Sequence, residues 1–186
     1  MRLILTMSQL TVTPTAVNRY LAAGSPGLVA FDLRLPHSYV RKSVKGFLTP
    51  LKHDDLREPA CQPTRERMRL YVAGSPDCTI EVRPRARSYV TIEDILYALH
   101  HTLHKSVDRD RWTRDKRDKN TASRVLTAYS RRCKEAAKYG MFDETNKGGL
   151  KKIDYLGQCH SFAGLNLAYG QGDSEWWMVE VEQQPS

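Results

Sequence analysis

Residues 91–103 read TIEDILYALHHTL, and this stretch decides the fold class. Its apolar residues follow the spacing i, i+3, i+4, i+7 and i+11, which forms one stripe along a helix; they are Ile92, Ile95, Leu96, Leu99 and Leu103. Thr91 and Asp94 have the spacing of a capping box at a helix N-terminus. The sequence therefore predicts an amphipathic helix that begins just after Thr91 and buries one face.

Two strand pairs are indicated on either side of this helix. Residues 68–73 alternate between apolar and polar side chains, a turn follows at Gly74-Ser75-Pro76-Asp77, and residues 78–82 return as a second strand. Residues 162–169 and 175–181 form a similar pair, separated by a glycine-rich turn. Both pairs are predicted to be antiparallel hairpins because their connections are short.

A further strand, a later strand region and a second helix complete the predicted elements. Residues 28–33 read as a buried strand, and residues 151–156 begin the later strand region. A second amphipathic helix is predicted from about Ala122 to Lys138, followed by Gly140 as a stop. Because helices and strands do not alternate, the predicted fold is α+β, with a mostly antiparallel sheet and two principal amphipathic helices packed on it.

The length of 186 residues suits a single domain. Residues 1–27 are poorly patterned, and residues 36–67 read as a long irregular connection that contains four prolines. Hydrophobic residues make up 40% of the chain, which is enough for a core. No apolar run approaches the roughly 18 residues that span a bilayer, and the apolar start is too short for a secretion signal. We therefore expect a cytoplasmic, monomeric protein with no membrane contact.

Neither the cysteines nor the histidines indicate a cofactor. The cysteines are widely spaced and lack a Cys-x-x-Cys pair, which predicts reduced thiols; they are Cys61, Cys78, Cys133 and Cys159. Cys159 next to His160 is kept as an alternative nucleophile pair, although neighbours on a strand point to opposite faces. His100 and His104 share a helix face, but no third ligand accompanies them. We expect no metal and no other cofactor.

Positive charge is concentrated in residues 105–138. The chain carries a net charge of +8, and this segment holds twelve Lys or Arg and five Asp or Glu, a net charge of +7. Such a segment attracts phosphates without reading bases, and aromatic side chains within it can stack on exposed bases. The nucleic-acid-binding candidates are Arg109, Arg111, Trp112, Arg114, Lys116, Arg117, Lys119 and Arg124. The alternative is a charged helix surface with partly paired ions.

Several polar residues are candidates for catalysis, each with a structural alternative. Asp32 and Arg34 lie two residues apart at the end of the predicted first strand, where they either act in a site or form a salt bridge. Asp154 precedes Gly157, a position where backbone can approach a ligand or simply turn. Glu135 and Lys138 bracket a Glu-Ala-Ala-Lys segment that places both charges on one helix face.

That segment resembles the Glu-Ala-Ala-Arg helix of plant ribosome-inactivating N-glycosidases. The resemblance implies that the acid stabilises a cationic ribose while the arginine assists the departure of adenine. Lys138 replaces the arginine here and lacks its planar fork of donors. The same four residues are also a strong helix former, so the match alone is weak.

Four segments together resemble an uncharacterised domain family of mushroom-forming fungi. They are Phe31–Pro36, Ile80–Pro84 leading into Val90–Ile92, Ala128–Cys133, and Ile153–Gly157 with Phe162–Leu165, and the match spans roughly residues 28–167 in order. Phe31 stands where the family usually has Trp. The resemblance implies an intracellular domain with no agreed activity. Length and basicity are also similar to those of a mushroom ribosome-inactivating toxin, which implies an rRNA N-glycosidase that releases an adenine from large-subunit rRNA.

Depurination needs a stacking ring, a cation near the base and a carboxylate near the ribose. The candidates that supply them, expected to meet where a helix crosses strand ends, are Asp32, Arg34, Tyr129, Arg132, Glu135 and Asp154. The partner would be RNA, most simply that of the ribosome. The competing hypothesis is a non-catalytic module that binds RNA or an acidic protein through the same basic segment.

Overall fold

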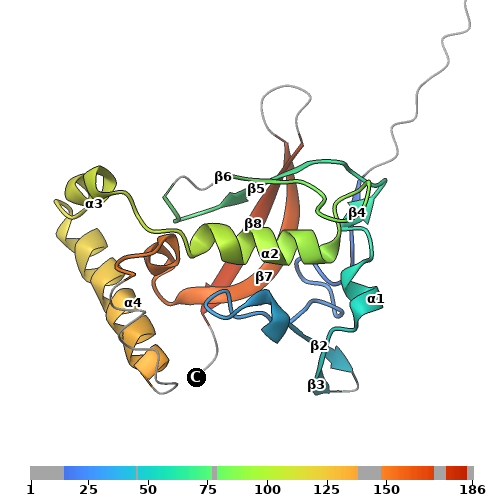
Figure 1. Ribbon diagram of the computed structural model, residues 1–186, viewed down its shortest axis with the longest axis horizontal. Helices are drawn as coiled ribbons and strands as arrows, with labels where there is room; N and C mark the ends of the chain where they lie inside the picture. The colour runs from blue at the N-terminus through green and yellow to red at the C-terminus, as the bar shows by residue number, and fades with distance from the viewer. Residues whose placement is uncertain (1–14, 45, 77–78, 138–147, 170–174, 184–186) are drawn as a thin grey trace, which may run out of the picture.

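We analysed a computed structural model, which describes residues 15–44, 46–76, 79–137, 148–169 and 175–183. Helices and strands alternate irregularly along the chain (Figure 1). In order they are β1 (Ala16–Val17), η1 (His37–Tyr39), β2 (Arg41–Val44), β3 (Phe47–Pro50), α1 (His53–Leu56), β4 (Cys61–Gln62), β5 (Met68–Val72), β6 (Thr79–Val82), α2 (Ile92–Leu103), α3 (Arg109–Asp115), α4 (Lys119–Ala137), η2 (Lys152–Leu156), β7 (Cys159–Tyr169) and β8 (Glu175–Gln183). The α+β class is confirmed.

The main sheet has four strands in the order β6-β5-β8-β7. Both predicted hairpins are present: β5 pairs antiparallel with β6, and β7 pairs antiparallel with β8. The central pair, β5 with β8, is parallel, with Leu70 opposite Trp177. The sheet is therefore mostly antiparallel, as predicted, and one parallel pair joins its two hairpins.

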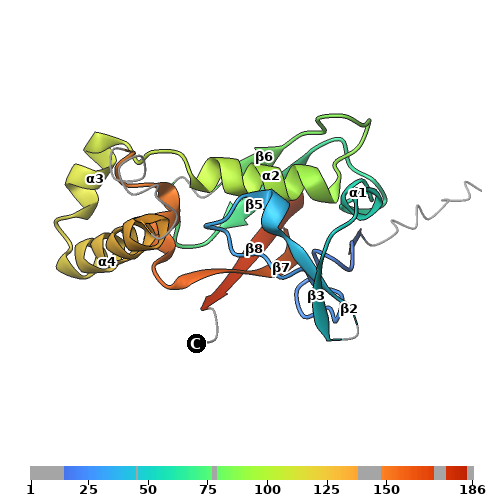
Figure 2. The same cartoon turned by 60° about the horizontal axis from the view of Figure 1, so that its bottom comes forward.

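Helix α2 lies across this sheet, and the core forms between them (Figures 1 and 2). All five residues of the predicted stripe are buried. The capping box is also confirmed: the backbone N–H of Asp94 donates to Thr91 Oγ1 at 3.2 Å, and the Thr91 N–H donates to Asp94 Oδ2 at 2.9 Å. The stripe and the cap thus act together, because the cap sets where the helix begins and the stripe sets which face it buries.

Residues 28–33 do not form the predicted strand. Val29, Phe31 and Leu33 are buried, so the alternation is real. However, the segment makes only isolated bridges, Ala30 with Arg41 on β2 and Asp32 with Ser161 on β7. It therefore bonds to two different sheets at single points and lacks a continuous ladder of hydrogen bonds to either.

The two other regions that differ from prediction contain short elements. Residues 36–67 were predicted to be one irregular connection, but they contain η1, β2, β3, α1 and β4, separated by turns and prolines. Residues 152–156 form the 3-10 helix η2 instead of a strand. Here the Lys151 N–H donates to Asp154 Oδ2 at 2.8 Å, and Gly157 ends the turn with a φ of 66°. The aspartate side chain therefore captures a backbone donor that a strand would have used in a ladder.

The basic segment forms two helices, α3 and α4, where the sequence predicted one helix from residue 122. Asp118 separates them, because its carboxylate accepts hydrogen bonds from the N–H groups of Asn120 at 3.2 Å and Thr121 at 3.1 Å and so starts α4. Helix α4 packs against η2 beside the sheet, whereas α2 packs on the sheet itself (Figure 1). Lys138 and Gly140 lie outside the described residues, as do residues 1–14 of the N-terminal segment.

No helix in the described residues combines the length and the apolar character needed to cross a bilayer.

Replacing Leu99 with Ala should lower the free energy of unfolding by about 2–5 kcal/mol, because Leu99 is fully buried and its loss leaves a cavity in the core. Leu126→Ala is the matched control, since this leucine is exposed on α4 and its truncation should change stability by less than about 0.5 kcal/mol. Urea denaturation of both variants measures the difference. Equal losses would show that α2 does not provide the core against the sheet.

Candidate functional site

Five charged residues meet where α4 approaches η2 and the segment after residue 31. Arg34 joins two of them: its Nη2 lies 2.7 Å from Asp32 Oδ2, and its Nη1 lies 2.7 Å from Glu135 Oε2 on α4. Asp32 also accepts a hydrogen bond from the Arg34 backbone N–H at 2.9 Å. The two-residue spacing lets Arg34 fold back onto Asp32 while its remaining nitrogen reaches α4.

The second ion pair joins α4 to η2. Arg132 Nη2 lies 2.7 Å from Asp154 Oδ2, and Arg132 Nε donates to Asp154 Oδ1 at 2.9 Å, so the pair is bidentate. Arg132 also donates to the Gly149 carbonyl at 3.0 Å. The Asp154 side chain is 2% exposed and that of Arg132 is 11% exposed. We call Asp32, Arg34, Arg132, Glu135 and Asp154 the ion-pair cluster.

Burial and charge act in opposite directions within the ion-pair cluster. Burial alone would raise the pKa of Asp32, but the contacts with His160 and Arg34 outweigh it and hold that pKa well below its usual range. Burial likewise disfavours the charged form of Arg34 and of Arg132. Their carboxylate partners nevertheless raise the pKa of both guanidinium groups. All three groups are therefore ionised at neutral pH.

His160 lies beside the cluster on β7 and is buried. Its Nδ1 lies 3.4 Å from Asp32 Oδ1, but this nitrogen makes no hydrogen bond to any described residue. The contact is an ion pair only when the ring is protonated, so Arg34 is the stronger partner of Asp32. The His160 carbonyl accepts from the Leu33 N–H at 2.8 Å, which fixes the ring next to the segment that carries Asp32.

Tyr129 borders the cluster from α4. The Arg132 guanidinium lies 5.4 Å from the centre of the Tyr129 ring, a cation–π contact. Burial and the neighbouring Cys133 raise the pKa of the Tyr129 hydroxyl. The structure thus brings all six catalytic candidates of the sequence to one place, with Arg132 paired to Asp154 and Glu135 paired to Arg34.

The concave surfaces near the cluster differ greatly in size. A cavity of about 10 Å³ touches Arg34, Arg132 and His160, which is room for about one water molecule. A groove of about 340 Å³ opens beside it between α4 and Gly157-Gln158, and Arg124 and Arg131 line it. A base therefore fits in the groove but not in the cavity among the ion pairs.

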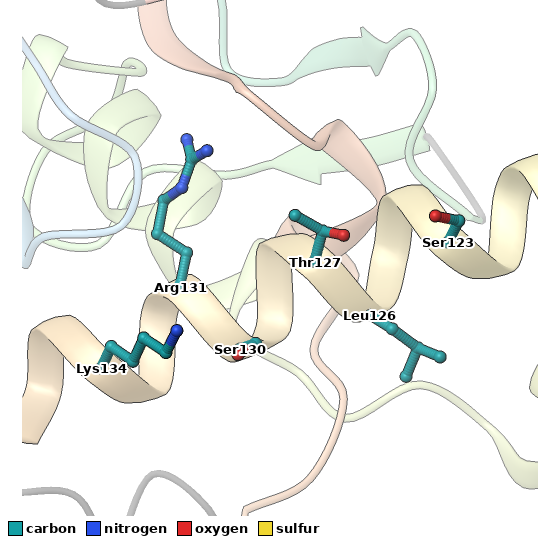
Figure 3. A pocket seen from close by; sticks show the side chains of 6 residues that line it. All are labelled: Ser123, Leu126, Thr127, Ser130, Arg131 and Lys134. Carbon is teal, nitrogen blue, oxygen red and sulfur yellow. The ribbon is translucent and has the colours of Figure 1, made fainter.

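A second depression of about 590 Å³ runs along the outer surface of α4. Figure 3 shows its six side chains, all carried by α4: Ser123, Leu126, Thr127, Ser130, Arg131 and Lys134. Ser123, Thr127 and Arg131 belong to both surfaces. Small hydroxyl side chains, two cations and the exposed Leu126 thus line a shallow surface over the middle of α4.

Residues 29–175 match the family described as "Family of unknown function (DUF6699)". The chain belongs to this family. The matched range contains the whole ion-pair cluster, His160 and both basic helices. Neither a curated protein nor a solved structure matches the chain significantly.

Most nucleic-acid-binding candidates of this DUF6699 chain lie on its surface. Those that are exposed are Arg109, Arg114, Lys116, Arg117, Lys119 and Arg124. Arg111 pairs with Asp115 at 2.7 Å. Trp112 is half-buried and packs edge to face on Tyr155, with ring centres 6.4 Å apart. Trp112 therefore anchors α3 to η2 and is a poorer base-stacking candidate than the sequence suggested.

The thiols and imidazoles of the DUF6699 chain make structural contacts. Cys61, Cys133 and Cys159 are free thiols, and Cys78 lies outside the described residues. The His100 and His104 rings lie 4.1 Å apart, and His104 Nε2 lies 3.1 Å from the Leu33 carbonyl oxygen. Burial and the neighbouring imidazoles lower the pKa of His100 to about 4. In the described part of the chain, no three His, Cys, Asp or Glu side chains converge to hold a metal.

Asp32→Asn should destabilise the protein at neutral pH and have a smaller effect in acid. Folding lowers the pKa of Asp32 below its unfolded value of about 3.9, so the ionised carboxylate stabilises the fold above roughly pH 4. That contribution is lost as the pH falls through the lower folded pKa. Urea denaturation of both proteins between about pH 2 and 7 measures it. A stability difference that stays constant over this range would contradict the ionised pair.

Proposed function

We propose that this protein binds RNA through the surface of α3 and α4. The observation that supports it is the concentration of positive charge: residues 105–138 carry a net charge of +7 out of +8 for the chain. Phosphate contacts from Lys and Arg supply most of the affinity of such surfaces, and they do so for any base sequence.

Most of the acidic residues of the segment make their close contacts with backbone groups or with Arg111 and Tyr155 rather than with the other cations of the segment. Asp108 and Asp118 accept backbone hydrogen bonds at the starts of α3 and α4, and Asp115 is occupied by Arg111 and Tyr155. Among the described residues, no carboxylate forms an ion pair with Arg114, Lys116, Arg117 or Lys119. These four exposed cations are therefore available to phosphates.

RNA is favoured over duplex DNA by the shape and by the sequence. The groove between α4 and Gly157-Gln158 has a volume of about 340 Å³, which would admit one unstacked base, and Arg124 and Arg131 line it. The sequence has no helix-turn-helix, zinc-finger or zipper pattern that would place a helix in the major groove. An exposed RNA loop, such as one of the ribosome, offers both phosphates and splayed bases.

Changing Arg114, Lys116, Arg117 and Lys119 to Glu should weaken RNA binding. It should also make binding less sensitive to salt, because each lost phosphate contact reduces the number of counterions released on binding. The matched control changes Arg57, Arg67, Arg83 and Arg87 to Glu, which alters the net charge equally but on exposed residues elsewhere. Fluorescence anisotropy with a labelled single-stranded RNA at several salt concentrations measures both. Equal losses in the two variants would show that only net charge matters.

Depurination of rRNA is a second candidate function, and the convergence of the six catalytic candidates supports it. The reaction breaks the bond between adenine and C1′ of ribose, water adds to C1′, and adenine leaves with a proton. Glu135 is the most accessible carboxylate of the cluster, with a side chain 39% exposed, and it would stabilise the cationic ribose. Arg131, in the groove, would face the base.

If the protein depurinates ribosomes, Glu135→Gln should lower the rate by at least about a hundredfold, since preorganised charges at a reaction centre contribute that much. The fold should persist because Arg34 keeps its pair with Asp32. Aniline treatment of RNA from incubated ribosomes reports one discrete fragment per depurinated site. Glu66→Gln, an exposed acid outside the cluster, is the control. If the unaltered protein releases no fragment, the enzyme is excluded while RNA binding stands.

A further inference from the structure

Exposed apolar side chains are concentrated on the hairpin of β2 and β3 and in the segment just before it. In the described part of the chain, seven large hydrophobic residues are exposed, and five of them fall between residues 35 and 48: Leu35, Tyr39, Val44, Phe47 and Leu48. Phe47 is 75% exposed and Leu48 is 64% exposed. Patches of this kind mark contact with a protein or a membrane.

The apolar residues lie on both faces of the hairpin. Val44 is opposite Phe47, so this pair shares one face, while Leu48 is opposite Ser43 on the other face. The two strands form a sheet of their own, which projects away from the main sheet and α2 in both views (Figures 1 and 2). A flat protein surface would cover only one face of such a hairpin, whereas a lipid layer surrounds both.

Lys and Arg residues lie close in the sequence to the exposed apolar side chains of the hairpin. Residues 33–53 contain five Lys or Arg and no Asp or Glu. Lys42 is paired with Asp55, and Arg34 belongs to the ion-pair cluster. The Arg41 guanidinium lies 5.9 Å from the centre of the exposed Tyr39 ring, a combination of cation and amphipathic ring that suits the headgroup region of a bilayer. Anionic headgroups attract such cations while the apolar end enters the acyl boundary.

Contrary to the expectation from the sequence of no membrane contact, we propose that the β2–β3 hairpin docks on an anionic lipid surface, with Phe47 and Leu48 inserted and the adjacent cations at the headgroups. The hairpin shares no residue with α3 or α4, and it lies on the other side of the main sheet from them along the long axis (Figure 1). The two proposed surfaces therefore share no residue, so we expect substitutions at the hairpin to leave RNA binding unchanged.

The test is sedimentation of the full chain with vesicles of phosphatidylcholine alone or mixed with phosphatidylserine. Binding is expected only with phosphatidylserine, and Phe47→Ser with Leu48→Ser should reduce it by about tenfold or more, because both side chains leave water on insertion. Both residues are exposed, so the fold should be unchanged. The matched control is Leu126→Ser, an exposed leucine on α4.

Three results would overturn the proposal: no binding to phosphatidylserine vesicles, unchanged binding of the double variant, or an equal loss in Leu126→Ser. The first of these would instead favour a protein partner for the hairpin. RNA binding by the double variant, measured in parallel, should remain at the level of the unaltered protein, so that the failure of one proposal is distinguishable from the failure of the other.

Discussion

The bidentate pair between Arg132 and Asp154 is the contact on which the position of α4 depends. Only Val125 and Cys133 are buried among the nineteen residues of α4, so apolar packing alone orients the helix weakly. Arg132 and Asp154 are both largely buried, and Asp154 also caps the start of η2. A buried pair returns little net stability because both charges lose their hydration. Its contribution here is geometric, since it holds one face of α4 against η2 and leaves the other for solvent.

The three carboxylates of the ion-pair cluster differ in how accessible they are and in how firmly arginines hold them. A catalytic carboxylate must interact more strongly with the transition state than with its resting partners. Asp32 and Asp154 are both held by arginines in the resting structure, and Asp154 is almost inaccessible. Glu135 differs because it is partly exposed and shares Arg34 with Asp32. The two pairs therefore differ in accessibility: the buried Arg132–Asp154 pair positions α4, and the partly exposed Glu135, held by Arg34, is the carboxylate that the proposed depurination would use.

The parts of the fold that were predicted correctly are those with local and repeated signals. The stripe of α2, its Thr91 cap and both hairpins of the main sheet follow from spacing and turn residues within short windows. The two wrong strand predictions share a physical cause, because in each a side chain or a distant segment takes the hydrogen bonds that a strand would use. Asp154 turns residues 152–156 into η2, and residues 28–33 divide their bonds between β2 and β7.

The candidate site shows the same division. The sequence identified the six catalytic candidates by residue type and expected them to meet, and the structure brings them together. The pairing could not be predicted, since Arg132 meets Asp154 and Arg34 meets Glu135 across about 20 to 100 residues of chain. The partial burial of Trp112 could not be predicted either, because its partner Tyr155 lies on η2, a segment that was predicted from the sequence to be a strand.

The basic surface and the helices that carry it arise from one pattern of residues. Asp108 and Asp118 begin α3 and α4 by accepting hydrogen bonds from backbone N–H groups. At a helix N-terminus the carboxylate faces the positive end of the helix dipole, so part of its charge is offset by backbone rather than by a cation. Asp115, which pairs with Arg111, also accepts a hydrogen bond from the Tyr155 hydroxyl. Burial and this bond raise the pKa of that hydroxyl to about 12. The acids of the segment thus stabilise the helices and their attachment, while Arg114, Lys116, Arg117 and Lys119 remain exposed on the surface.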